Sequence, residues 1–194
     1  LIHKANLTGN IEPDIALFFQ DCQEIVVVAN LPYYITTPIL MRFLETSKRV
    51  NRMVLMMQSE VGMRVTSKPS TKDYNALTVV INYRADTKYL FKVPKTVFVP
   101  EPNVDSAIIE IIIKNVIENK PKNEAFFFDF VHRCFTQRRK TLLNNLRDSY
   151  SQFDRLVWET LLIDMGYNLT IRAEALSIDD FIKLSDKVDG MINQ

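Results

Sequence analysis

A short motif able to do chemistry follows the first strongly apolar segment of the chain. Residues 25–29 are apolar and mostly β-branched, and Asn30, Leu31, Pro32 and Tyr33 come directly after them. If the segment is a buried strand, the motif lies at its carboxyl end, where α/β sheets bind ligands. The Asn30 amide oxygen and the Pro32 carbonyl can accept hydrogen bonds from an amine, and the Tyr33 ring can stack on a flat base. Methylation of an exocyclic adenine amine needs such groups. The alternative is a plain turn, because Asn and Pro are common turn residues.

Basic side chains form the second candidate site. The chain has a formal net charge of only +1, so composition alone gives no reason to expect a nucleic acid partner. The local distribution differs, with five basic residues close together: Arg133, Arg138, Arg139, Lys140 and Arg147. Lys68 and Lys72 make a second basic site in a polar, turn-forming loop that we expect to be mobile. Such clusters suit phosphate contacts, although the same charges also occur on ordinary solvated surfaces or pair with Asp and Glu.

Hydrophobic patterns predict an α/β arrangement around the first motif. A helix is expected near residues 13–21, strands at 24–30 and 52–58, and a helix at 38–47 between the two strands. The first strand is apolar throughout, which favours a parallel sheet covered on both faces. Later expected elements are a helix at 60–65, a helix or strand at 76–83, and strands at 89–93 and 106–113. Prolines at positions 94, 100 and 102 predict a stiff extended loop before the last strand.

The composition changes after residue 114. Residues 115–123 are polar, and the remaining apolar residues recur at helical spacing, with Asp154, Gly166 and Ser177 suited to helix boundaries. We therefore predict two domains, an α/β portion at residues 1–114 and a small all-helical portion at 115–194.

Composition excludes several other classes of protein. At 194 residues, 47% hydrophobic and 24% charged, the chain is typical of a globular protein, and it lacks the apolar run of a membrane span or signal peptide. We expect a cytoplasmic protein with no membrane partner. Cys22 and Cys134 are expected to be reduced and structural. His3 and His132 lack the spacing of a metal site, so no metal is expected.

Several longer motifs, in order, resemble the family of small-subunit ribosomal RNA adenine N6-dimethyltransferases, which includes the bacterial kasugamycin-resistance enzyme. These motifs are NLPYYITTP at 30–38, QSEVGMR at 58–64, KPSTKDY at 68–74, VFVPEPNVDSA at 97–107, FTQRRKTLLNNL at 135–146 and RAEALS at 172–177. The resemblance extends from about residue 4 to residue 184. It implies a class I, Rossmann-like methyltransferase sheet followed by a helical RNA-binding domain.

The resemblance also implies an activity and a set of roles. The enzyme would use S-adenosylmethionine to dimethylate two adjacent adenosines near the 3′ end of small-subunit ribosomal RNA, within the assembling subunit. Asn30, Pro32, Tyr33 and Phe98 would hold the target base, with Phe98 stacking opposite Tyr33, and Asn30 with Leu31 would form one wall of the cofactor pocket. The alternative for Phe98 is a core position between two strands. The basic residues named above would contact RNA.

One part of the family pattern has no counterpart in the sequence. The family begins with a strand and a Gly-rich turn that cradles the cofactor, but this chain has four glycines and no Gly-x-Gly. We therefore expect a fragment with an incomplete sheet, less stable than a full protein, inactive alone and weak in binding cofactor. Two alternatives remain open: a non-catalytic ribosome assembly module, and the related large-subunit methylase of macrolide resistance.

Overall fold

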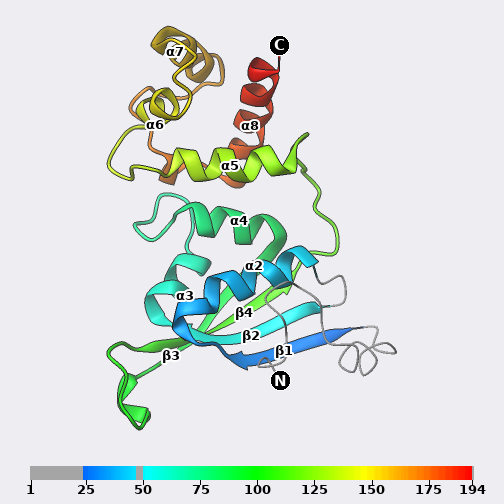
Figure 1. The fold of residues 1–194 in the computed structure, drawn as a ribbon, viewed down its shortest axis with the longest axis vertical. Helices are drawn as coiled ribbons and strands as arrows, with labels where there is room; N and C mark the ends of the chain where they lie inside the picture. The colour runs from blue at the N-terminus through cyan, green and yellow to red at the C-terminus, as the bar shows by residue number, and fades with distance from the viewer. Residues whose placement is uncertain (1–23, 47–49, 194) are drawn as a thin grey trace. The chain divides into compact units, whose positions relative to one another are not determined.

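The computed structural model describes residues 24–46 and 50–193 (Figure 1). The helix predicted at residues 13–21, together with Cys22 and His3, lies outside these residues. The described part contains a four-stranded sheet in the order β1-β2-β4-β3. Its strands are β1 (Ile25–Asn30), β2 (Val50–Gln58), β3 (Ala85–Val93) and β4 (Ser106–Ile113). Strands β1 and β2 run parallel, whereas β4 pairs antiparallel with both β2 and β3. The sheet is therefore mixed, and the expectation of a parallel sheet holds only for its first pair.

Burial in the sheet follows the alternation of side chains across a strand. On β2, Met53, Leu55 and Met57 are fully buried, and the residues between them are only partly buried. Strand β1 differs from its prediction, because Val26 is 56% and Val28 is 76% exposed. The prediction that this strand is buried on both faces is wrong for the described structure. A β-branched apolar run reports strand propensity, whereas burial depends on what packs against the strand.

Helix α2 (Thr36–Thr46) connects β1 to β2 and follows a 3₁₀ turn, η2 (Tyr33–Ile35). The predicted start at residue 38 is two residues late, because the turn passes directly into the helix. Leu40 and Leu44, one helical turn apart, are buried. The chain then continues into α3 (Ser59–Thr66).

The segment at 76–83, ambiguous in the sequence, is a helix, α4 (Ala76–Arg84). The Asn75 side chain caps its first turn by accepting a hydrogen bond from the Thr78 N–H at 3.3 Å. Val79 and Tyr83 lie four residues apart and enter the core of the helical part of the chain. The segment is too short for its hydrophobic periodicity to distinguish a helix from a strand. The capping hydrogen bond and the packing together favour the helix.

The remaining helices are α5 (Glu124–Cys134), α6 (Leu142–Ser149), α7 (Arg155–Asp164) and α8 (Ile178–Ile192), with a 3₁₀ turn, η4 (Ala173–Ala175), before α8. Asp154 is the N-cap residue of α7, and Gly166 has a φ of +80° just beyond its end. Ser177 caps α8 in a capping box with Asp180. The three predicted helix boundaries are confirmed. Cys134 is a free thiol buried in this core, and burial raises its pKa.

The described residues divide into two compact units. One contains the residues up to Ser59 and Ala85–Asn115, and the other contains Glu60–Arg84 and the residues from Val116 onwards. The second unit, here called the helical unit, thus includes α4 and all of α3 except Ser59, which the predicted border at residues 114–115 assigned to the α/β portion. The domain border itself stays a prediction. In the described residues, no helix is both long and apolar enough to span a membrane.

Candidate functional site

The carboxyl end of β1 carries the first candidate residues. Asn30 is the last residue of the strand, pairs in register with Met56 of β2, and is exposed. Leu31 is only 1% exposed, and its N–H extends the parallel pairing by donating to the Met56 carbonyl at 3.2 Å. The buried Leu31 anchors the chain directly after Asn30. The exposed amide is therefore held on a fixed backbone at the edge of the sheet.

The turn that follows uses the carbonyl of Pro32. This oxygen accepts hydrogen bonds from the Ile35 N–H at 3.1 Å and from the Thr36 hydroxyl at 3.0 Å. Thr36 is 2% exposed, so its hydroxyl has little access to water and depends on this bond. A carbonyl oxygen has two lone pairs. A substrate amine could therefore reach the Pro32 carbonyl only by displacing a donor of the turn.

Tyr33 begins the η2 turn. The position of its side chain lies outside the described structure, so its predicted stacking role stays a prediction.

Phe98 lies in the proline-rich loop between β3 and β4, directly after the 3₁₀ turn η3 (Lys95–Val97). The residue is half-buried, and its N–H donates to the Lys95 carbonyl at 3.2 Å. Asp105 braces the two ends of this loop: its carboxylate accepts from the Lys95 N–H at 2.9 Å and pairs with the Lys92 ammonium at 2.6 Å. The hydrogen bond from Lys92, followed by that from the Lys95 backbone, lowers the pKa of Asp105. The prolines alone suggested the stiffness of this loop, and the part played by Asp105 was missed.

Strand register brings the base of this loop to the same edge as Asn30. Ser106, the first residue of β4, pairs with Gln58 at the carboxyl end of β2, and the Ser59 N–H donates to the Asp105 carbonyl at 2.9 Å. Because β1 and β2 are parallel, their carboxyl ends share one edge of the sheet. Asn30 and the anchored end of the Phe98 loop therefore belong to one candidate active site.

In the helical unit, Arg133 is engaged within the fold. Its guanidinium pairs with Asp129 at 2.6 Å, donates to the Ser149 carbonyl at 3.1 Å and lies 5.1 Å from the centre of the Tyr150 ring. The hydrogen bond to Asp129 raises its pKa. These contacts tie α5 to the end of α6, so Arg133 has a structural role whatever else it does.

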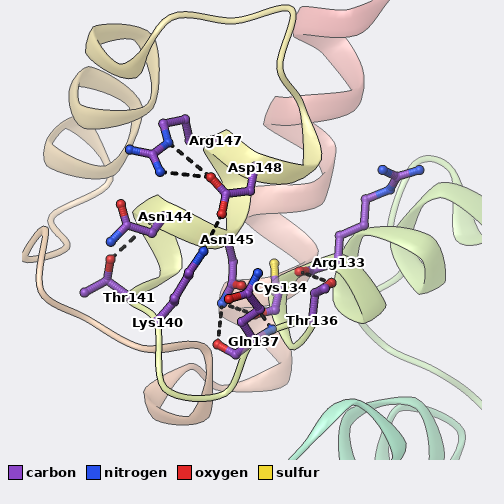
Figure 2. A network of polar contacts seen from close by, with 10 residues as sticks. All are labelled: Arg133, Cys134, Thr136, Gln137, Lys140, Thr141, Asn144, Asn145, Arg147 and Asp148. Carbon is purple, nitrogen blue, oxygen red and sulfur yellow. Dashed lines mark hydrogen bonds and ion pairs between the residues drawn. The ribbon is translucent and has the colours of Figure 1, made fainter.

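Lys140 and Arg147 share one carboxylate. Asp148 accepts from Lys140 at 2.7 Å and from Arg147 at 2.9 Å, as Figure 2 shows. The hydrogen bond from Lys140, followed by that from Arg147, lowers the pKa of Asp148. Two positive charges beside one negative charge leave a net positive group at this surface.

Arg138 and Arg139 are exposed, and Arg138 joins the two basic sites of the sequence. Its guanidinium donates to the backbone carbonyl of Lys72, which places the loop at 67–73 beside the basic turn within the helical unit. The Ser70 N–H also donates to the Glu174 carbonyl at 2.7 Å. The loop is thus bonded to its unit at two points, while the expectation that it is mobile stays a prediction. Lys68 and Lys72 are exposed there.

The turn that carries these charges depends on Asn145, a residue that sequence reasoning missed. Asn145 is 3% exposed, and its amide nitrogen donates to the carbonyls of Cys134 at 3.0 Å and Gln137 at 3.2 Å. Its oxygen accepts from the Gln137 N–H at 3.2 Å, so that one side chain closes the turn between α5 and α6 (Figure 2). The sequence could have indicated that Asn145 is buried, because it lies three residues after Leu142 and beside Leu146, on the apolar face of a helix.

Among the described residues, no group of three or more His, Cys, Asp or Glu side chains is placed to hold a metal ion.

Comparison with known proteins identifies the family. The family described as ribosomal RNA adenine dimethylase matches residues 1–188. The chain belongs to this family. It is 43% identical over 188 residues to the ribosomal RNA small subunit methyltransferase A of Bacillus cytotoxicus, and equally identical to that of Bacillus mycoides. In both comparisons the match covers 96% of this chain and 64% of the relative, so the chain spans about two thirds of the relatives' length.

Two solved structures share the fold. The crystal structure of a dimethyladenosine transferase from Plasmodium falciparum superposes with a TM-score of 0.69 at 24% identity, covering 85% of this chain and 66% of the other. The crystal structure of the 23S rRNA methyltransferase ErmE superposes with a TM-score of 0.63 at 22% identity, covering 94% and 69%. The predicted α/β class and class I methyltransferase fold are confirmed by this likeness.

Proposed function

We propose that the protein transfers methyl groups from S-adenosylmethionine to the N6 amines of two adjacent adenosines near the 3′ end of small-subunit ribosomal RNA. Membership of the adenine dimethylase family supports the reaction class, and the curated relatives are small-subunit methyltransferases. The observation that carries the proposal is Asn30, an exposed amide on an anchored backbone at the carboxyl end of β1.

Asn30 and Leu31 fit a cofactor pocket as one wall, because an exposed amide and a buried apolar residue meet at the edge of a parallel strand pair. Bound there, S-adenosylmethionine supplies an electrophilic methyl group on a sulfonium sulfur. The Asn30 oxygen accepts a hydrogen bond from the target amine and turns its lone pair away from the ring and towards that methyl group. The amine nitrogen would bond the methyl carbon as the bond from that carbon to sulfur breaks, the sulfur would keep the electron pair as a neutral thioether, and the nitrogen would lose a proton to water. The Pro32 carbonyl, already bonded to two donors, first serves to hold the turn.

The aromatic residues hold the base in this proposal. Tyr33 and Phe98 stack on opposite faces of the extruded adenine, and the anchoring of the loop through Asp105 limits the movement of the Phe98 backbone. A rigid platform reduces the ordering that must accompany base binding.

The basic surface of the helical unit binds the RNA backbone. Arg138 and Arg139 are exposed, and the group around Asp148 is net positive. Lys68 and Lys72 extend this surface through the bond between Arg138 and the Lys72 carbonyl. The partner is the small-subunit RNA within the assembling subunit, which puts the site of action in the cytoplasm.

The test measures methyl transfer to adenosine N6 in immature small subunits for the unaltered protein and for Asn30→Ala. The matched control is Asn115→Ala, which makes the same change at an exposed asparagine outside the site. We expect Asn30→Ala to lower transfer about 100-fold while RNA affinity stays within about twofold. Unchanged transfer in Asn30→Ala would remove Asn30 from the mechanism. RNA binding with no transfer by the unaltered protein would agree with the expectation of an inactive fragment and with the alternative of a ribosome assembly module, and would contradict the proposal that this chain transfers methyl groups.

A further inference from the structure

A hollow of about 290 Å³ lies in the helical unit. Its volume is at the lower end of ligand pockets, which span about 300–1,000 Å³, so it suits a group the size of one base. The side chains that matter for its chemistry come from α3, the first turn of α4, and α5 with the turn after it: Arg64, Ala76, Leu77, His132, Phe135 and Arg138.

An aromatic ring of fixed orientation forms part of its lining. The Phe135 ring packs edge-on against Tyr74, with centroids 6.1 Å apart, and at a tilt against Phe181, with centroids 5.7 Å apart. Tyr74 is held in turn by a hydrogen bond from its hydroxyl to the Leu176 carbonyl at 2.9 Å. Phe135 is half-buried, so these contacts hold the ring while part of it stays exposed. Such a ring is suited to stacking on a base.

Two guanidinium groups give the hollow a positive charge. Arg64 pairs with Glu60 one helical turn away, and Arg138 donates to the Lys72 carbonyl. A guanidinium has five N–H donors, so one partner leaves others for a phosphate. Glu60 offsets part of the charge of Arg64, which makes Arg138 the stronger phosphate ligand.

Arg138 also lines a second, open hollow of about 550 Å³, whose other lining residues are Gln137, Arg139 and Lys140. One arginine therefore lies between a basic surface suited to an RNA backbone and a smaller hollow with an aromatic wall. An RNA strand bound along the basic surface would therefore reach Arg138, which also lines the smaller hollow.

We propose that this hollow binds one unpaired nucleotide of the RNA, with its base against Phe135 and its phosphate at Arg138, separate from the adenosine that is methylated. The inference rests on the RNA binding proposed above and adds a preference for RNA that carries an unpaired nucleotide. Phosphate contacts alone do not distinguish such RNA from a plain duplex, whereas a stacked base does.

The experiment measures the dissociation constants of two stem-loop RNAs by fluorescence anisotropy at one salt concentration. The two RNAs are identical except for a single bulged adenosine in one stem. The protein is compared with Ala76→Leu, which fills the hollow without a stacking ring, and with Ala125→Leu, the same change at an exposed position of α5. Both changes keep good helix formers, so the fold should persist.

We expect the unaltered protein and Ala125→Leu to bind the bulged RNA about tenfold more tightly than the plain stem-loop. Ala76→Leu should bind both RNAs equally, with the same affinity for the plain stem-loop as the unaltered protein. Equal binding of both RNAs by the unaltered protein, or a preference that survives in Ala76→Leu, would refute the nucleotide site and leave the RNA-binding proposal standing. Failure to bind either RNA would overturn both. Loss of the preference in the presence of micromolar adenosine monophosphate would assign the hollow to free nucleotides instead.

Discussion

Replacing Asn145 by alanine should destabilise the helical unit, because one buried side chain closes the turn that presents the basic surface. The change removes three hydrogen bonds, with lengths of 3.0, 3.2 and 3.2 Å. At about 1 kcal/mol each, the bonds sum to about 3 kcal/mol. Gln137 is exposed, so water can replace its two bonds in part, whereas the bond to Cys134 is buried. We expect the free energy of unfolding to fall by about 2 kcal/mol.

The chain provides both the probe and the control for this measurement. Trp158 is the one tryptophan of the sequence and is fully buried in the helical unit, so its fluorescence during urea unfolding reports on that unit. A loss of about 2 kcal/mol lowers the urea midpoint by about 1 M for an m-value near 2 kcal/mol/M. Asn144→Ala makes the same change at the neighbouring position of α6, where the side chain is half-buried.

We expect Asn144→Ala to change stability by less than about 0.5 kcal/mol. Both variants gain the same helix propensity, so the difference between them isolates the hydrogen bonds of Asn145. Equal midpoints for the two variants would refute the conclusion that the Asn145 amide holds the turn.

Three further predictions concern the other charged and polar groups. Arg139→Gln should reduce the slope of log affinity for RNA against log salt by about 1, measured by anisotropy from low to moderate salt; an unchanged slope would take Arg139 out of the interface. The pKa of Asp148 is lowered in the folded protein, so the ionised carboxylate stabilises the fold at pH values above the ordinary carboxyl pKa. This contribution to the free energy of unfolding is lost as the pH falls through the pKa of Asp148 in the folded protein. Asp148→Asn should therefore narrow the gap between the urea midpoints at pH 6 and pH 3, and a gap equal to that of the unaltered protein would contradict this. Thr36→Val removes one of the two donors to the Pro32 carbonyl, so it should lower the free energy of unfolding by about 1 kcal/mol and also lower methyl transfer. Thr36→Ser keeps the hydroxyl and should retain transfer; a serine variant as impaired as the valine variant would show that the hydroxyl is not what matters.

Local features of the sequence predicted much of the fold. The run of apolar residues before Asn30 predicted the strand, and Asp154 and Ser177 predicted the starts of two helices. Such signals act over a few residues, because a strand's propensity and a helix's cap depend on side chains close in the chain. The order of the longer motifs was sufficient to predict the family.

Burial and the pairing of polar groups were decided only by the tertiary structure. Arg138 meets the carbonyl of Lys72 across 66 positions of the sequence, and the exposure of Val28 depends on the surroundings of β1. The burial of Asn145 depends on the packing of its helix, since an asparagine between leucines could equally have faced solvent.

The sequence by itself determined which residue types were available for chemistry: an amide after a strand, an aromatic residue in a proline-rich loop, and a cluster of arginines and lysines. The tertiary structure decided how they are used. It engaged Arg133 within the fold, gave Lys140 and Arg147 one shared carboxylate, and left Arg138 and Arg139 exposed. The physical reason is that a charge or a hydrogen-bonding group acts on whatever lies within a few ångströms, and chain folding sets those neighbours.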